Sequence, residues 1–502
     1  MTAPSPSDTT PSPTTPLPTT RQSSTTQSNE AAPRTPADDR LVIGLLLVSA
    51  FVVILNETIM GVAIPHLVVD LGITANAAQW LTTAFMLTMA VVIPITGFLL
   101  QRFNTRPIFL AAMSLFSAGT LVAALAPGFE ALLVGRVIQA SGTAIMMPLL
   151  MTTVLTLVPP ATRGRTMGNI SIVISVAPAI GPSISGLILS AFEWRWMFGI
   201  VFPIAIAALV LGAVKVRNVT TPKPAPLDVL SVIFSALAFS GIVYGLSSLT
   251  ESVTVGISTL AVGVVFLAAF IIRQIGLQRV ERALLDLRTF LSKTFTLAIV
   301  MMAISMMAMF GSFIVLPFYL QGVLGLEVLQ TGLLLLPGGL LMGILSPIVG
   351  RLYDRFGPTV LLVPGAITVS AVFWALTMLT PTTPVWLVLI AHIALSAGLA
   401  FLFTPLFTAG LGALTPNLYS HGSAVLGTVQ QLAGAAGTAL FVTVMSSKAL
   451  SLGAGGASEA VATTGGVTSA FLYGAIISMG AIVVAFFIRK PADSIGGTPM
   501  VH

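Results

Sequence analysis

The sequence predicts an all-α polytopic membrane protein, because the chain is very apolar and its apolar runs are long enough to span a bilayer. The 502 residues are 56% hydrophobic and only 8% charged, with a mean hydropathy of +1.01. A soluble domain needs a much higher share of charged residues on its surface. About 20 consecutive apolar residues in a helix cross the hydrocarbon core, and runs of this length recur along most of the chain.

Counted in order, these runs give about 14 spans, which we expect to form two six-helix halves with two inserted helices between them. The halves would cover residues 41–214 and 294–490, and the linker with the inserted helices would cover 215–293. The flanking segments 1–40 and 491–502 would be cytoplasmic tails, the first of them disordered because it is rich in Ser, Thr and Pro. The spans lie near residues 41–63, 77–100, 107–126, 131–157, 167–190, 196–214, 227–249, 255–272, 294–320, 329–350, 358–380, 384–414, 422–446 and 468–488.

The basic residues predict how these spans are oriented. Of the 22 Lys and Arg residues, 19 fall in the N-terminal tail or in alternate loops, on one side of the predicted membrane, and the opposite side keeps only Arg195 and Lys448. By the positive-inside rule the basic side is cytoplasmic. Both termini should therefore face the cytoplasm, with the protein in the cytoplasmic (plasma) membrane. The net charge of +6 then reflects topology, and no nucleic-acid partner is expected.

One carboxylate lies deep in the first span: Glu57, flanked by Asn56 and Thr58. A charge near mid-membrane costs about 2.5–3.5 kcal/mol even on lenient insertion scales, so such residues are functional candidates. A low dielectric favours the protonated form of a carboxyl group, whereas a nearby guanidinium favours the carboxylate. We therefore expect Glu57 to bind and release protons. The alternative is that Glu57 only pairs with another helix to fix packing.

Arg136 is the basic counterpart of Glu57, because it lies inside the fourth span. It follows Glu130, at the outer end of that span, by about six residues or roughly 9 Å, which is a depth similar to that of Glu57. We expect the two side chains to approach each other across the first and fourth spans. Gln139, one turn along the same face, can orient the guanidinium. Alternatively, Arg136 snorkels to the outer interface.

Two short segments repeat between the halves. GFLLQRFNTR (97–106) follows the second span and GRLYDRFGP (350–358) follows the tenth, so that Gly, Leu, Arg and Phe recur in register. Weak repetition between two six-helix halves is typical of transporters whose halves rock around a central site. The arginines of such loops can bond helix C-termini or nearby carboxylates.

With these segments, the sequence resembles the major facilitator superfamily in its 14-span drug:proton antiporter branch, and it is most similar to lincomycin-resistance-type exporters. LNETIMGVAIP (55–65) resembles the first-helix signature of that branch, LLVGRVIQASGTA (132–144) its fourth-helix motif, and APAIGPSISG (177–186) its fifth-helix motif GPxxGG. The sequence departs from the family pattern at Ser185, which replaces a glycine. It also has Gln101 and Asn104 in the first loop copy, where Asp and Gly are usual.

The resemblance implies a proton-coupled multidrug efflux antiporter and assigns roles to particular residues. Proton coupling would fall to Glu57, Arg136 and Gln139. The two prolines of the fifth span, with the glycines beside them, suit a hinge that seals the two halves, although on spacing alone a plain packing kink is equally expected. The residues that the resemblance links to conformational change are Gly97, Arg102, Arg106, Pro178, Gly181, Pro182, Gly186, Gly350, Asp354 and Arg355.

A Met- and Phe-rich stretch in the ninth span is a candidate lining for a substrate cavity. Soft side chains such as Met306, Phe310 and Phe313 suit varied apolar compounds, although they fill lipid-facing packing just as often. Asn56 and Thr58 would add polar groups beside the deep carboxylate. One such carboxylate favours neutral or cationic substrates over anions, and the resemblance implies amphipathic compounds of lincosamide or dye type.

Other classes of function lack support in the sequence. The chain has no cysteine, and its four histidines, His66, His392, His421 and His502, lack metal-ligand spacing. There is no GxxxxGK[ST] loop, so we expect no ATP-driven transport and take the proton gradient as the driving force. The spans lack clusters of His and Asp residues, so we expect no enzyme, no metal and no cofactor. The expected partners are small-molecule substrates, protons and the lipid bilayer, and the expected state is a monomer. The alternatives are an exporter of a native lipid, siderophore or metabolite, or a non-transporting membrane protein.

Overall fold

The computed structural model describes residues 36–220, 222, 226–249 and 252–489, and within these ranges it contains 14 long α-helices and no strand. Each of the 14 is long and apolar enough to cross a membrane, which confirms the predicted number of spans. The helices are α1 (Pro36–Asp70), α2 (Ala75–Arg102), α3 (Thr105–Ala124), α4 (Phe129–Leu157), α5 (Arg163–Ala191), α6 (Arg195–Lys215), α7 (Val229–Ser248), α8 (Val253–Leu277), α9 (Lys293–Gly322), α10 (Val328–Phe356), α11 (Thr359–Leu376), α12 (Val385–Gly412), α13 (Tyr419–Ala454) and α14 (Glu459–Ala485).

Several helices extend beyond the predicted boundaries. α1 begins at Pro36, so the last residues of the predicted tail 1–40 are helical, whereas residues 1–35 and the C-terminal tail lie outside the described residues. α14 begins at Glu459 rather than near 468, because the Ser458 side chain accepts a hydrogen bond from the Val461 N–H and caps the helix. Most of each repeated loop motif is also helical, since α2 continues to Arg102 and α10 to Phe356.

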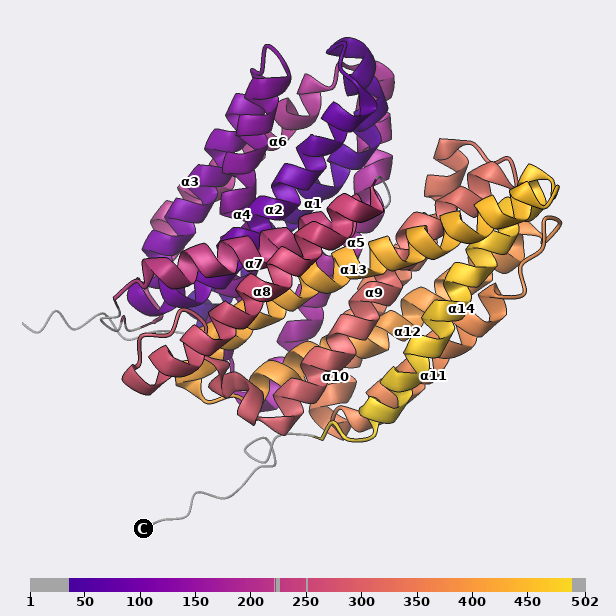
Figure 1. The fold of residues 1–502 in the computed structure, drawn as a ribbon. Helices are drawn as coiled ribbons and strands as arrows, with labels where there is room; N and C mark the ends of the chain where they lie inside the picture. The colour runs from indigo at the N-terminus through magenta and orange to yellow at the C-terminus, as the bar shows by residue number, and fades with distance from the viewer. Residues whose placement is uncertain (1–35, 221, 223–225, 250–251, 490–502) are drawn as a thin grey trace, which may run out of the picture.

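The helices form two bundles, which Figure 1 shows side by side. Helices α1–α6 make the N bundle and α9–α14 make the C bundle, while α7 and α8 pair with each other as an inserted hairpin. α7 packs against α2 of the N bundle and also against α13 of the C bundle. The inserted hairpin therefore contacts both halves of the molecule.

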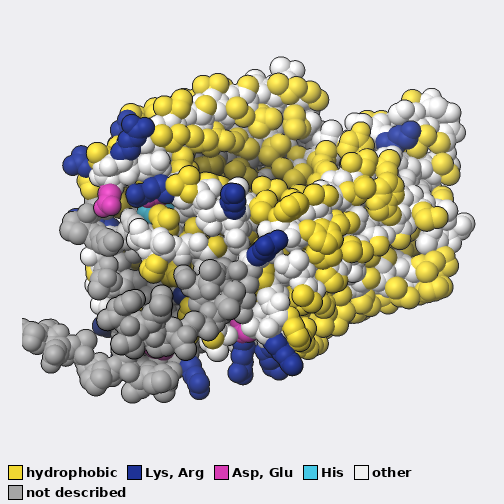
Figure 2. All heavy atoms as spheres, turned by 90° about the horizontal axis from the view of Figure 1, so that it is seen from below, with side chains coloured by type: hydrophobic (Ala, Val, Ile, Leu, Met, Phe, Trp, Pro, Cys, Tyr) yellow, Lys and Arg dark blue, Asp and Glu magenta, His cyan; other side chains and the backbone are white. Residues whose placement is uncertain are grey.

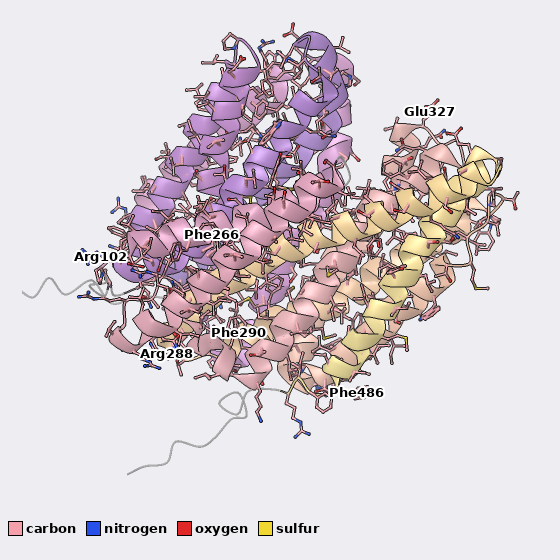
Figure 3. All side chains as sticks on the ribbon, viewed as in Figure 1. Arg102, Phe266, Arg288, Phe290, Glu327 and Phe486 are labelled. Atoms are coloured by element: carbon pink, nitrogen blue, oxygen red, sulfur yellow. The ribbon has the colours of Figure 1, made fainter. Side chains whose placement is uncertain are left out.

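The two ends of the molecule differ in charge. Arg102 and Arg288 lie at one end, which we call the basic end, and Glu327 lies at the other (Figure 3). Figure 2 shows that Lys and Arg side chains gather towards the basic end, while hydrophobic side chains cover most of the flank. This distribution suits a molecule whose flank faces lipid and whose ends face water.

The two bundles are in close contact along the half of their seam nearest the basic end. A Cβ added at Gly168 of α5 would lie 2.5 Å from the Ser346 carbonyl oxygen of α10, and a Cβ at Gly350 would collide with the Gly164 carbonyl oxygen. Towards the other end, Gly186 of α5 and Gly332 of α10 have no atom within 4 Å of a Cβ position. The bundles accordingly diverge in Figure 1. The conformation is closed at the basic end.

Candidate functional site

α1 presents Glu57 towards the interior of the molecule. Val48 is 57% exposed and His66 is also exposed, and each lies nine residues from Glu57 in sequence, on opposite sides of it. Nine residues are about two and a half helical turns, so Glu57 points away from the exposed flank that these two residues share. Its side chain is half-buried, whereas the preceding Asn56 is fully buried.

Arg136 of α4 is held almost entirely by neutral groups. It is 1% exposed, and its Nη1 donates hydrogen bonds to Gln139 Oε1 at 2.7 Å and to Asn56 Oδ1 at 3.5 Å. Its guanidinium carbon also lies 4.0 Å from the centre of the Phe85 ring, in a cation–π contact. Gln139 is itself fixed, since its Nε2 donates to Thr120 Oγ1 at 2.8 Å. Arg136 therefore does not reach the outer interface.

The structure places Glu57 near Arg136 without joining the two directly. Arg136 bonds to Asn56, the residue that precedes Glu57, but among the described residues no hydrogen bond or ion pair within 4.0 Å involves the Glu57 carboxyl group. Arg136 Nε and Asn56 Nδ2 are buried donors with no partner among those residues. The site thus combines one half-buried carboxyl group, which has no bonding partner among the described residues, with a fixed positive charge nearby.

The candidate Thr58 faces α5 rather than Arg136. Its Oγ1 donates to the Leu55 carbonyl oxygen at 2.9 Å, and a Cβ at Gly181 would collide with this hydroxyl. Ser185, the residue that departs from the fifth-helix motif, donates from Oγ to the Ile59 carbonyl oxygen at 2.9 Å. These contacts fix α5 against α1 beside Glu57, and a cavity-lining role for Thr58 stays a prediction.

The other conformational candidates of α5 lie within one continuous helix. Pro178 and Pro182 are both inside α5, where each removes a backbone donor. Pro182 is exposed and Pro178 is half-buried. Gly186 lies in open space, so it makes no close packing contact in this conformation.

The apolar candidates of the cavity lie in the other bundle. Met306 of α9 is 2% exposed, and Phe310 and Phe313 are half-buried. Gly434 of α13 approaches the Phe310 ring, because an added Cβ there would lie 3.1 Å from it. Met306 therefore packs inside the C bundle rather than against lipid. Whether the two phenylalanines meet a substrate stays a prediction.

The second loop copy locks the basic end through a carboxylate. Asp354 Oδ1 and Oδ2 accept hydrogen bonds from the N–H groups of Gly164 at 2.8 Å and Arg165 at 2.9 Å. These donors belong to the first turn of α5, where backbone N–H groups lack helical partners and a negative charge is favoured. In the first copy, Gln101 Nε2 donates instead to the Asn417 carbonyl oxygen at 3.3 Å. The exchange of Asp for Gln thus replaces a charged contact with a neutral one.

The arginines of the two loop copies make different contacts. Arg106 donates to the Ala213 carbonyl oxygen near the end of α6 at 2.6 Å, Arg355 lies over the Phe356 ring, and Arg102 is exposed. Sequence reasoning did not single out Arg163, which donates to Tyr419 Oη of the C bundle at 3.1 Å. Its position beside the fourth span was visible in the sequence, but the partner across the seam was not.

Comparisons with known proteins agree with this architecture. The family model described as Major Facilitator Superfamily matches residues 46–438. The chain is 40% identical over 468 residues to an uncharacterized MFS-type transporter, YcnB, of Bacillus subtilis, covering 92% of this chain and 98% of that protein. It is 40% identical over 458 residues to the lincomycin resistance protein LmrB of Listeria monocytogenes, covering 89% and 96%. A multidrug resistance protein B homolog of Mycobacterium tuberculosis is 28% identical over 424 residues, covering 81% and 77%.

Two solved structures share the fold at low sequence identity. The human organic anion transporter MFSD10 superposes with a TM-score of 0.64 at 14% identity, over 90% of this chain and all of that one. The proton:xylose symporter XylE superposes with a TM-score of 0.63 at 14% identity, over 91% and 98% of the two chains. At this identity the likeness concerns the fold and not the substrate.

Proposed function

The chain belongs to the major facilitator superfamily, and we propose that it exports amphipathic, neutral or cationic compounds of lincosamide or dye type in exchange for protons. The family identifies it as a multi-pass membrane transporter rather than an enzyme. We further propose that transport is coupled to protons, that the substrates are drugs of this class and that the protein acts as a monomer.

The observation that carries the proposal is the Glu57 site. The half-buried Glu57 carboxyl group has no bonding partner in the described part of the chain, so it can exchange a proton without breaking a contact seen there. The fixed guanidinium of Arg136 biases that exchange. A conformational change that alters the distance between Glu57 and Arg136 would change the affinity for the proton. Gln139 keeps the guanidinium in place, so that Glu57 is the group that responds.

Two observations support the proposed substrate class: the charge of the deep carboxylate and the sequence similarity to a resistance protein. A single deep carboxylate attracts a cation and repels an anion. The relative named a lincomycin resistance protein aligns over 89% of this chain, so lincomycin is the first compound to try. An exporter of a native lipid, siderophore or metabolite is the alternative, and a substrate screen separates the two.

The proposed orientation places the basic end in the cytoplasm. Loops rich in Lys and Arg are retained on the cytoplasmic side of bacterial-type membranes, and both described ends of the chain lie at the basic end because the number of helices is even. The conformation closed at the basic end would then be open to the outside. This is the state in which an exporter releases its substrate and takes up a proton.

Proteoliposomes with an imposed pH gradient test the proposal. Wild type, Glu57→Gln and a matched control, Glu130→Gln at the exposed start of α4, are compared for uptake of labelled lincomycin and of a lipophilic dye cation. We expect gradient-driven uptake by wild type and Glu130→Gln, and a loss of at least about tenfold in Glu57→Gln, which corresponds to about 1.4 kcal/mol. Equal transport by all three proteins would show that Glu57 does not couple transport to protons. Transport by none would overturn the drug class.

A further inference from the structure

The C-terminal part of α8 contains a buried glutamine with three hydrogen bonds. Gln274 is 0% exposed. Its Nε2 donates to Ser231 Oγ of α7 at 2.7 Å, and its Oε1 accepts from the backbone N–H groups of Leu284 at 2.7 Å and Leu285 at 3.3 Å. This one side chain therefore ties the inserted hairpin to the connection that leads from α8 to α9.

The tied part of this connection is buried, although connecting segments usually lie on the surface. Leu284, Leu285 and Asp286, which we call the 284–286 segment, are 1%, 3% and 4% exposed. The Asp286 carboxylate is held by Arg288, whose Nε donates to Oδ2 at 2.8 Å and to Oδ1 at 3.0 Å. The segment is thus fixed on one side by the hairpin and on the other by its own ion pair.

The 284–286 segment sits where the two bundles meet. An added Cβ at Gly97 of α2 would lie 3.5 Å from the Leu284 carbonyl oxygen, 3.4 Å from the Ala424 Cβ of α13 and 3.2 Å from His421 Nδ1 of α13. His421 Nδ1 is buried and has no hydrogen-bond partner among the described residues. Three elements therefore converge at Gly97: α2 of the N bundle, α13 of the C bundle and the 284–286 segment.

We propose that Gln274 is a positioning residue that holds the 284–286 segment as a latch over the seam between α2 and α13, and that this latch stabilises the closed basic end. If the bundles rock, α2 and α13 must separate at this end, and the segment must lose its contacts with at least one of them. The inserted hairpin then does more than fill the space between the halves. This inference rests on the rocking motion of the proposed transporter, but not on its substrate or its ion.

A cysteine introduced at the seam can measure opening of the basic end, because the chain has no cysteine of its own. Ser423 of α13 is 2% exposed, and its Oγ accepts a hydrogen bond from Thr152 Oγ1 of α4 across the seam at 3.3 Å. The variant Ser423→Cys should therefore react with a maleimide only when the basic end opens. The reaction is followed in nanodiscs, with Gln274→Ala compared to the unaltered Gln274 in this background.

In the Ser423→Cys protein, we expect Gln274→Ala to raise the rate of maleimide labelling several-fold. The matched control is Gln278→Ala, one turn further along the chain, because Gln278 Oε1 is buried without a hydrogen-bond partner among the described residues. This control should be labelled at the same rate as the Ser423→Cys protein without a further substitution. Thermal midpoints are measured in parallel. If Gln274 only stabilised the fold, Gln274→Ala would lower the midpoint but would not change the labelling rate at temperatures far below that midpoint.

A second variant keeps the test decisive if Gln274→Ala fails to fold. Arg288→Ala removes the side-chain bonds to Asp286 from a residue whose side chain is 40% exposed, so it loosens the segment without touching the hairpin. It should also accelerate labelling. Unchanged labelling in every folded variant would overturn the latch. Because labelling needs no substrate, a failure of drug transport and a failure of the latch are distinguishable.

Discussion

Arg136 donates a hydrogen bond to the amide oxygen of Asn56 and, in the described part of the chain, none to the carboxylate of the adjacent Glu57. The guanidinium is held by Asn56, Gln139 and the Phe85 ring, all of which are neutral. Its position therefore does not depend on whether Glu57 carries a proton. The bonds that fix the positive charge are thus separate from the carboxyl group that we propose as the proton carrier.

The first prediction concerns the partner that fixes Arg136. Gln139→Leu should destabilise the protein and abolish gradient-driven transport, because it removes the 2.7 Å bond to a buried guanidinium. Nη1 would then keep only the longer 3.5 Å bond to Asn56, and poor pairing of a buried charged donor costs about 1–3 kcal/mol. Thermal unfolding of the purified protein and transport in proteoliposomes are the two measurements.

Thr120→Val is the graded control for that prediction. It removes the acceptor of Gln139 Nε2 and a bond from the Thr120 hydroxyl to the Phe116 carbonyl oxygen. The guanidinium keeps its own partners, so the loss of stability should be smaller. If Gln139→Leu were as stable and active as wild type, Arg136 would not need this anchor.

The second prediction concerns the lock at the basic end. Asp354→Ala should favour opening of that end, because it removes a carboxylate that accepts two N–H bonds at the start of α5. A charge in this position is worth about 1–2 kcal/mol, which changes the ratio of closed to open molecules about 5–30-fold. Maleimide labelling of the Ser423→Cys protein measures the change.

Gln101→Ala is the comparison for Asp354→Ala. It removes one neutral hydrogen bond at 3.3 Å in an exposed setting, which contributes only about 0.5–1.5 kcal/mol. Labelling should therefore rise less than with Asp354→Ala. A larger rise with Gln101→Ala would show that the first loop copy, despite its altered residues, holds the basic end.

The features that could be predicted from the sequence are those with a large energetic signature. A bilayer requires about 20 apolar residues for each crossing helix, so the number of helices was predicted and is confirmed. A charge deep in such a helix is costly, so Glu57 and Arg136 stood out, and the structure brings them near each other. The helix ends were less predictable, because α1 and α14 continue into polar sequence, where hydropathy no longer distinguishes helix from loop.

The contacts of neutral polar residues could not be predicted in the same way. Thr120, Ser185 and Gln274 all bond across helices, yet a Ser, Thr or Gln in an apolar span has the same sequence signal whether it meets a neighbour or its own backbone. Their partners depend on the rotation and register of two helices, which a single sequence does not contain. For the same reason Asn56 was expected to line a cavity, and its bond to Arg136 was not foreseen.

The third prediction compares two glycines that were both linked to conformational change. Gly350→Ala should weaken the closed basic end, because the added Cβ would collide with the Gly164 carbonyl oxygen, and backbone cannot yield easily. Overpacking of this kind costs about 1–3 kcal/mol. Gly186→Ala should leave the labelling rate unchanged and should not lower the thermal midpoint, because nothing apart from the nearby backbone of its own helix lies within 4 Å of its Cβ position and Ala is the better helix former. Equal effects of the two substitutions would contradict the packing described at the seam.

The fourth prediction concerns the inserted hairpin and its dependence on pH. Asp228 precedes α7 and accepts two 2.7 Å bonds from Arg273 of α8. The hydrogen bond from Arg273, together with those from Ser231, holds the pKa of the Asp228 carboxyl well below its usual range, against the opposing effect of burial. A depressed pKa in the folded state means that the stabilisation is fully present above the unfolded pKa of about 3.9 and is lost as the pH falls through the folded value.

Asp228→Asn should therefore lower the thermal midpoint by a constant amount from about pH 8 down to about pH 5, and the difference from wild type should shrink below about pH 4. The midpoints of both proteins are measured at about pH 7 and about pH 3.5. Asp70→Asn, at the exposed end of α1, serves as the matched carboxylate control and should leave the midpoint unchanged at about pH 7. A deficit of Asp228→Asn that grew on acidification would mean that the ion pair with Arg273 does not stabilise the hairpin.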